Sequence, residues 1–152
     1  MKAFVICTQS SLEKRCKPSV RLLQQSNLIE VVRAFKAVTP DKIDQSKVHP
    51  YTLHTIRNKD KRSAEDLTHI NQLACALSHY ALMKLCVEMQ EPIIIAEDDI
   101  MEDKFILDNI QRIKQVPDDA DMILLSHNGV ETLATDGLNR VMKVVKFDGM
   151  QC

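Results

Sequence analysis

Glycine is scarce in this chain, and its distribution excludes the glycine-rich phosphate loops. The three glycines are Gly129, Gly137 and Gly149, so the first 128 residues contain none. Both common nucleotide-binding loops need glycines near the N-terminus of the first helix, where the backbone approaches the phosphates. A nucleotide would therefore have to be held by other means, and carboxylates with a bound cation are the remaining device.

Long apolar runs and a strong net charge are also missing. No apolar stretch approaches the roughly 18 residues of a membrane-spanning helix, and we expect no transmembrane segment. Residues 1–7 (MKAFVIC) are too short and too quickly polar for a signal peptide, and they are typical of a first strand. The formal net charge of −1 gives no general attraction to nucleic acid, which we exclude as a partner.

The five cysteines show no paired spacing that would indicate a redox or zinc motif. They are Cys7, Cys16, Cys75, Cys86 and Cys152, and no two form a Cys-x-x-Cys pair. Cys7, Cys75 and Cys86 lie in apolar stretches. We therefore expect them to be reduced core residues of a cytoplasmic protein, because disulfides follow oxidising compartments.

A chain of 152 residues is long enough for a single domain with its own core. Patterns of β-branched residues predict strands over 2–7, 29–38, 93–96, 121–126 and 140–147. Helical spacing predicts one helix from Ser11 to about Ser26, opened by a Ser10–Glu13 capping box, and another over 103–116. The clearest helix runs from Asp66 or Thr68 to before Pro92, with its apolar stripe at Leu73, Leu77, Ala81 and Leu85, widened by Ala76, Tyr80 and Met83.

Residues 40–66 are the least regular part of the sequence, and two interpretations stay open. One is a solvated loop with short helical turns. The other is a segment whose basic side chains meet a phosphate. Those bases are Arg57, Lys59, Lys61 and Arg62.

Alternation of strands with helices predicts the fold class. The order is typical of an α/β domain with an open, mostly parallel sheet and helices on both faces. Ligands of such sheets bind at the carboxyl ends of the strands.

Three consecutive acids, Glu97, Asp98 and Asp99, stand at such an end, directly after the apolar run Ile93–Ala96. Packing cannot explain them, because adjacent carboxylates repel one another and lose hydration. On an extended strand Glu97 and Asp99 would share one side and Asp98 the other. We expect Glu97 and Asp99 to hold one Mn²⁺ or Mg²⁺ that keeps open positions for phosphate oxygens. A response-regulator receiver domain is excluded, because too little chain follows Asp99 and the next expected strand ends in Ser126 rather than an aspartate.

Two histidines lie near the expected site. His79 is either a packed helical residue or, with Ser78, a support for the acids or a nucleotide. His127 follows the expected fourth strand and would border the cleft. The remaining histidines are expected at the surface: His49, His54 and His69.

Two segments together resemble glycosyltransferase family 25, which includes lipooligosaccharide β-galactosyltransferases and collagen galactosyltransferases. They are residues 75–82 (CALSHYAL), close to the family's Gly-Cys-x-x-Ser-His helix, and residues 93–100 (IIIAEDDI), close to its strand ending in Glu-Asp-Asp. Residues 13–15 (EKR) and 35–38 (FKAV) are similar as well, so the resemblance covers most of the chain.

The resemblance implies a GT-A-type nucleotide-sugar fold and a metal-dependent inverting transferase that uses a UDP-sugar. It implies metal contacts for Glu97 and Asp99, and donor contacts for Arg15, Ser78, His79, Glu97 and Asp98. The expected sugar is a hexose, most simply galactose. The expected acceptor is a saccharide of a lipid-linked cell-surface glycan, with peripheral association of the enzyme at the membrane.

The sequence departs from the family in two ways. Asn71 and Ala74 stand where the family usually has glycines, and the chain stops just after Gly149, where the acceptor half of the family is expected. We therefore expect 1–152 to be a donor-binding domain without its acceptor half. The catalytic residue stays unassigned, with Asp98 and Asp99 as weak candidates.

That early stop leaves further expectations open. A general base would come from Asp118, Asp119 or Asp136, or from a partner chain. The alternative is a truncated, non-catalytic member that binds UDP-sugar or serves as an interaction module. An exposed sheet edge favours a homodimer.

Overall fold

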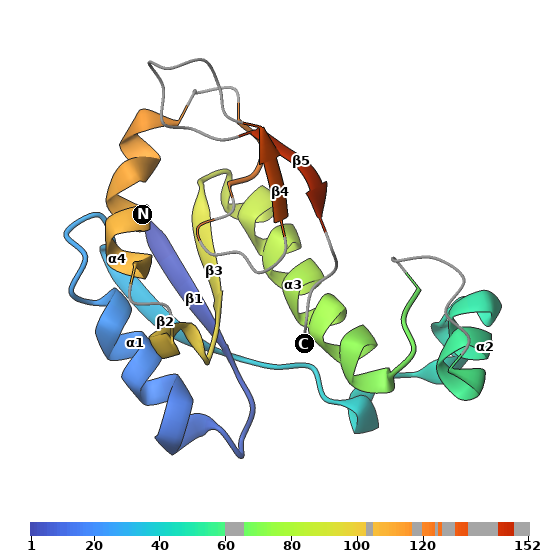
Figure 1. Cartoon of the computed structure of the whole chain (residues 1–152). Coiled ribbons are helices and arrows are strands. Elements are labelled where there is room, and N and C mark those ends of the chain that lie inside the picture. The colour runs from blue at the N-terminus through green and yellow to red at the C-terminus, as the bar shows by residue number, and fades with distance from the viewer. Residues whose placement is uncertain are drawn as a thin grey trace.

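A computed structural model describes residues 1–59, 66–102, 105–116, 120–123, 125, 130–133 and 143–147, the last two ranges as backbone only. Its main sheet has three parallel strands in the order β2-β1-β3 (Figure 1). The strands are β1 (Lys2–Cys7), β2 (Val31–Lys36) and β3 (Ile93–Glu97). This confirms the α/β class with a parallel open sheet.

The central strand β1 is shielded from water on both faces. Ala3 and Val5 are completely buried on one face, whereas Phe4 and Ile6 are nearly buried on the other. Strands covered on both faces read as unbroken apolar runs, which is why AFVIC and IIIA were recognisable in the sequence. The alternation of the pleat then assigns each residue of β3 to one of the same two faces.

One face of the sheet is covered by α1 (Lys17–Leu23) and α4 (Ile106–Gln111) (Figure 1). Leu23 and Ile110 are fully buried in this cluster beside the odd-numbered residues of β1. A single π-helical turn, η1 (Leu12–Cys16), leads into α1. The helix expected from Ser11 to Ser26 is thus present, in two pieces that meet before Pro18.

The opposite face is covered by α3 (Ile70–Met89). Its most buried residues are Ala74, Ser78 and Leu82, so the predicted stripe is wrong by one position. Leu73, Leu77, Ala81 and Leu85 are half-buried beside it, and Tyr80 and Met83 of the wider stripe are exposed. The apolar residues of this helix are spread around most of its circumference. Periodicity alone therefore could not tell which side faces the sheet.

The capping predictions were also wrong in detail. The N-cap of α3 is His69, and the Oε1 atom of Gln72 accepts the backbone N–H groups of Thr68 and His69 at 2.9 and 3.0 Å. Ser11 precedes η1 as expected, but no side chain caps that turn, because the Ser11 hydroxyl is bonded to Thr8 instead. Helix termini satisfy their free N–H groups with whichever acceptor the local chain presents.

The polar segment after β2 contains two short 3₁₀ turns, Pro40–Lys42 and Gln45–Lys47, and a nine-residue helix, α2 (Pro50–Asn58). Short helical turns were expected, and a helix of this length was not. Arg57 and Lys59 are exposed, whereas Lys61 and Arg62 lie outside the described residues. The phosphate interpretation of these bases stays a prediction.

The C-terminal strand predictions are corrected in part. Residues 121–123 and 125 of the fourth predicted strand form no strand, and Met122 and Ile123 are exposed there rather than paired against β3. The segment after it contains β4 (Val130–Leu133), which was expected to be loop, and β5 (Lys143–Phe147), which was expected. These two pair antiparallel as a separate two-stranded sheet.

The prediction of reduced core cysteines was wrong for Cys7 and Cys75. Cys7 forms a disulfide with Cys16, with a Cα–Cα distance of 5.6 Å, and Cys75 is also disulfide-bonded. Cys86 is free and half-buried. Eight residues separate Cys7 from Cys16, a spacing that belongs to no recognised motif, so only the turn of the chain after β1 brings them together. The expected cytoplasmic location rested on reduced cysteines, and the disulfide bonds of Cys7 and Cys75 remove that argument.

Among the described residues, no helix combines the length and apolar character of a membrane span. This agrees with the expectation drawn from the sequence.

The side of α3 that faces the sheet can be tested by truncation. Leu82→Ala removes a fully buried side chain, and we expect the free energy of unfolding to fall by about 2–5 kcal/mol. The matched control Val87→Ala, on a residue that is 75% exposed, should change it by about 0.5 kcal/mol or less. Urea denaturation followed by circular dichroism measures both, and equal effects would contradict the orientation of the helix.

Candidate functional site

The carboxyl ends of β1 and β3 form one edge of the sheet. The strands are parallel, with Ile6 opposite Glu97, so the turn after β1 lies beside the acid triplet. β3 ends at Glu97, and Asp98 and Asp99 occupy a turn before a 3₁₀ turn, Ile100–Glu102. This is the position at which ligands bind in open α/β sheets.

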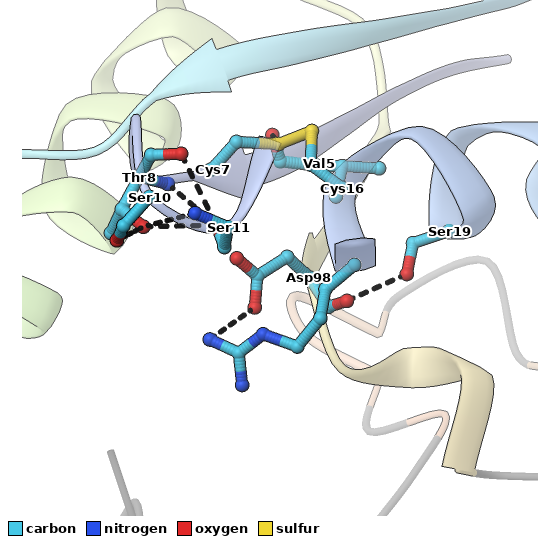
Figure 2. Close-up of a disulfide and its surroundings, with 9 residues drawn as sticks. Val5, Cys7, Thr8, Ser10, Ser11, Cys16, Ser19 and Asp98 are labelled. Carbon is cyan, nitrogen blue, oxygen red and sulfur yellow. Dashed lines mark hydrogen bonds and ion pairs between the residues drawn. A yellow bond between two sulfur atoms is a disulfide. The ribbon is translucent and has the colours of Figure 1, made fainter. Parts of the chain in front are cut away.

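Asp98 is the most firmly held of the three acids. It is 7% exposed, its carbonyl oxygen accepts the hydroxyl of the fully buried Ser19 at 2.8 Å, and its Oδ1 lies 3.1 Å from Nη2 of Arg15 (Figure 2). Both partners come from the segment after β1. A buried carboxylate needs such a partner, because an unpaired charge at this depth would be strongly destabilising.

The turn after β1 has a hydrogen-bonded frame of its own. The Ser11 hydroxyl oxygen accepts the backbone N–H of Thr8 at 3.1 Å and donates to its carbonyl, and the Thr8 hydroxyl oxygen accepts the N–H of Ser11 at 3.2 Å (Figure 2). The Cys7–Cys16 disulfide closes the same segment across its ends. Arg15 is therefore presented to Asp98 by a loop fixed at its start and its finish.

Glu97 points to the opposite face, towards α3. Its Oε1 lies 3.2 Å from Nε2 of His79 and 3.7 Å from Sγ of Cys75. The pleat explains this direction, since Glu97 is opposite Ile6 and shares the face of the sheet that α3 covers. The sequence correctly predicted that Glu97 and Asp98 would face opposite sides.

Asp99 is the exposed member of the triplet. Loss of hydration, followed by the negative charges of Glu97 and Asp98, raises the pKa of its carboxyl, and Arg15 opposes the rise. A raised pKa means that the ionised form is less favourable in the folded protein than in the unfolded one. The edge thus carries more negative charge than its own residues neutralise.

A divalent cation fits this set of groups. Mn²⁺ and Mg²⁺ prefer carboxylate oxygens, and the negative charge of Glu97 is, after loss of hydration, a cause of the raised pKa of Asp99. A second group of ligand atoms, from Cys75, His79 and Glu97, lies within 4.8 Å. Its sulfur belongs to a disulfide rather than a thiolate, which makes that group a poor site for a soft metal.

Ser78 lies next to the site but is turned into the core. It is fully buried, its hydroxyl donates to the Ala74 carbonyl at 2.9 Å and accepts the N–H of Val38 at 2.8 Å. It therefore fixes the chain that leaves β2 against α3. A direct contact of Ser78 with a donor stays a prediction from the resemblance.

Sequence reasoning missed Ser19 and the Cys7–Cys16 bond. Nothing distinguishes a serine after Pro18 from an ordinary first-turn residue, and its partner Asp98 is 79 positions away. Four residues named for the cleft or the base lie outside the described residues: Asp118, Asp119, His127 and Asp136. The surface positions expected for His49, His54 and His69 are confirmed.

The role of Ser19 gives a stability prediction. Ser19→Ala leaves the Asp98 carbonyl without its donor, and we expect a loss of about 1–3 kcal/mol in the free energy of unfolding. Ser10→Ala is the matched control, because its hydroxyl is exposed and bonds only to Thr8, and it should cost about 0.5 kcal/mol or less. Denaturant titration measures the free energy of unfolding of both variants. If Ser19→Ala leaves it unchanged, the Ser19–Asp98 bond does not stabilise the fold.

Of three comparisons with known proteins, the one with family models gives a match. The family model described as "Glycosyltransferase family 25 (LPS biosynthesis protein)" matches residues 1–148, which covers both central motifs and nearly the whole chain. No curated protein and no solved structure shows a significant match. The chain belongs to glycosyltransferase family 25, a family of glycosyltransferases of lipopolysaccharide biosynthesis.

Proposed function

We propose that this protein transfers a hexose, galactose in the simplest case, from a UDP-sugar to a saccharide acceptor of a cell-surface glycan such as lipooligosaccharide. The observation that carries the proposal is the acid triplet at the carboxyl end of β3, with a net negative charge that its neighbours do not neutralise. A GT-A-type arrangement of the sheet is part of the same proposal. Membership of family 25 supports a nucleotide-sugar donor.

The three acids have two roles in this proposal. Glu97 and Asp99 hold the cation and, through it, the diphosphate. Asp98 is fixed by Ser19 and Arg15 and orients the donor ribose or sugar. Arg15 is 55% exposed, which leaves part of its guanidinium available to a donor phosphate. His79 holds the Glu97 carboxylate from the α3 side.

The cation, Mn²⁺ or Mg²⁺, would neutralise the UDP leaving group as the bond between the sugar's anomeric carbon and the diphosphate oxygen breaks. The chain's own residues supply the rest: a rigid strand end, a buried carboxylate that cannot rotate freely, and a cationic side chain beside it. Preorganised charge of this kind costs little rearrangement during the reaction.

Donor binding is tested directly by calorimetric titration of UDP-galactose with and without Mn²⁺, followed by an assay for sugar transfer and donor hydrolysis. Metal-dependent binding with transfer supports the whole proposal. Metal-dependent binding without turnover limits it to a donor-binding protein. No binding under either condition would refute the donor site.

Asp99→Asn separates the function of the acid from its effect on stability. We expect metal-dependent UDP-galactose binding to weaken at least about tenfold, because one charged ligand is lost. The melting temperature should stay equal or rise, since the substitution removes a carboxylate whose ionised form is disfavoured in the fold. Asp108→Asn, on α4, is the control and should leave binding unchanged. Retained affinity in Asp99→Asn would exclude Asp99 as a ligand.

His79 offers a test by rescue. His79→Ala removes the partner of Glu97, and we expect Mn²⁺-dependent binding to fall by about 10-fold or more, as for outer-shell partners of metal ligands. His79→Gln keeps a donor at a similar reach and should recover much of the affinity. Loss of binding in both variants to the same extent, with unchanged melting temperatures, would contradict the proposed contact.

A further inference from the structure

We propose that the Cys7–Cys16 disulfide is a positioning element of the donor edge, and that its reduction releases Arg15 from Asp98. The proposal deepens the proposed function and rests on it for the effect on the donor. Its effect on the loop can be measured without any ligand.

The Cys7–Cys16 disulfide lies close in the chain to the two residues that contact Asp98. Cys7 is the last residue of β1, Cys16 is the last residue of η1, and Arg15 precedes Cys16 in the chain. Ser19 follows less than one helical turn later (Figure 2). Both contacts of Asp98 therefore come from within three residues of Cys16.

Besides the disulfide, this loop is held by local hydrogen bonds and by one partly exposed ion pair to Asp98. A single π-helical turn is marginal alone, because short helices are not stable in water. The Arg15–Asp98 pair is exposed on the arginine side, and exposed ion pairs hold a loop weakly. The Thr8–Ser11 bonds fix the start of the loop, and the Ser11 carbonyl accepts the N–H groups of Arg15 and Cys16 at 2.9 and 3.1 Å, so these bonds link residues of the loop to one another. The bond between Cys7 and Cys16 is the one covalent restraint between β1 and η1.

Reduction changes the packing as well as the connectivity. A dithiol reductant such as dithiothreitol gives up two electrons and two protons and becomes a disulfide itself. The Cys7–Cys16 bond takes up these two electrons and breaks, and each of its two sulfurs gains one proton. The two thiols occupy more space than the bonded sulfurs, at a point where Cys7 and Cys16 are 5% and 1% exposed. We expect the reduced pair to move the segment that carries Cys16, and Arg15 is the residue directly before it.

Thermodynamic linkage makes the effect reciprocal. If the oxidised loop binds the donor more tightly than the reduced loop, then bound donor must also protect the disulfide from reduction. The donor edge would therefore respond to the redox state of the Cys7–Cys16 pair through Arg15.

Hydrogen exchange with mass spectrometry tests the loop. Dithiothreitol should speed amide exchange in residues 8–19 of the wild-type protein by about tenfold or more, with residues 50–58 of the cysteine-free helix α2 unchanged. In Cys7→Ala/Cys16→Ala, exchange in 8–19 should already be fast and insensitive to dithiothreitol. Cys86→Ala is the matched control and should respond like the wild type, because Cys86 is free.

Alkylation mapping keeps the test decisive even if the double variant does not fold. The proposal is overturned if Cys7 and Cys16 are alkylated after reduction and exchange in 8–19 stays the same. It is also overturned if the two residues remain free thiols after oxidation, or if the folded double variant still responds to dithiothreitol in this segment.

Titration with UDP-galactose and Mn²⁺ tests the consequence for the donor. We expect the folded double variant to bind at least about fivefold more weakly than Cys86→Ala in the same oxidising buffer. Faster exchange with equal affinity would overturn the positioning role. Absence of binding in every variant would instead refute the donor site, while the exchange result would still decide whether the disulfide holds the loop.

Discussion

The pairing of β3 with β1 is the constraint on which the candidate site depends. β1 is buried on both faces, and its register with β3 fixes which residue of the acid triplet points to which side. Glu97 therefore meets α3, and Asp98 meets the segment that leads into α1. Consecutive acids of one strand end thus contact the helical layers on opposite faces of the sheet.

Asp98 and Asp99 differ in how well their neighbours support the ionised carboxylate. Asp98 is compensated by Arg15 and Ser19, whereas Asp99 keeps a carboxyl whose ionised form its neighbours disfavour. Carboxyl groups with a perturbed pKa are frequent at functional sites. Relief by a cation would turn the same repulsion into affinity for a metal-bound diphosphate.

Much of the sheet, and the position of the acid triplet at the end of β3, followed from the sequence. The apolar run Ile93–Ala96 predicts a buried strand, and the three acids that follow it mark the strand's end as a candidate site. The face of α3 did not follow, because apolar residues such as Tyr80, Met83 and Val87 lie on its outer side and blur the periodicity. Ser19 and the Cys7–Cys16 bond depend on contacts between distant segments and on the shape of one turn, and no local pattern encodes either. The antiparallel pair of β4 and β5 was missed for the same reason, since its short first strand resembles a loop.

The parallel register also has a consequence for synthesis on the ribosome. Residues 2–6 are made first, yet their partners on one side are residues 93–97, so this side of β1 must wait until most of the chain has emerged. Long-range pairing of this kind is slow and exposes apolar strand edges in the meantime. β2 can pair with β1 much earlier, and it would keep one side of the nascent strand covered during that interval. The acid triplet, in this order of events, is among the last parts of the sheet to be set in place.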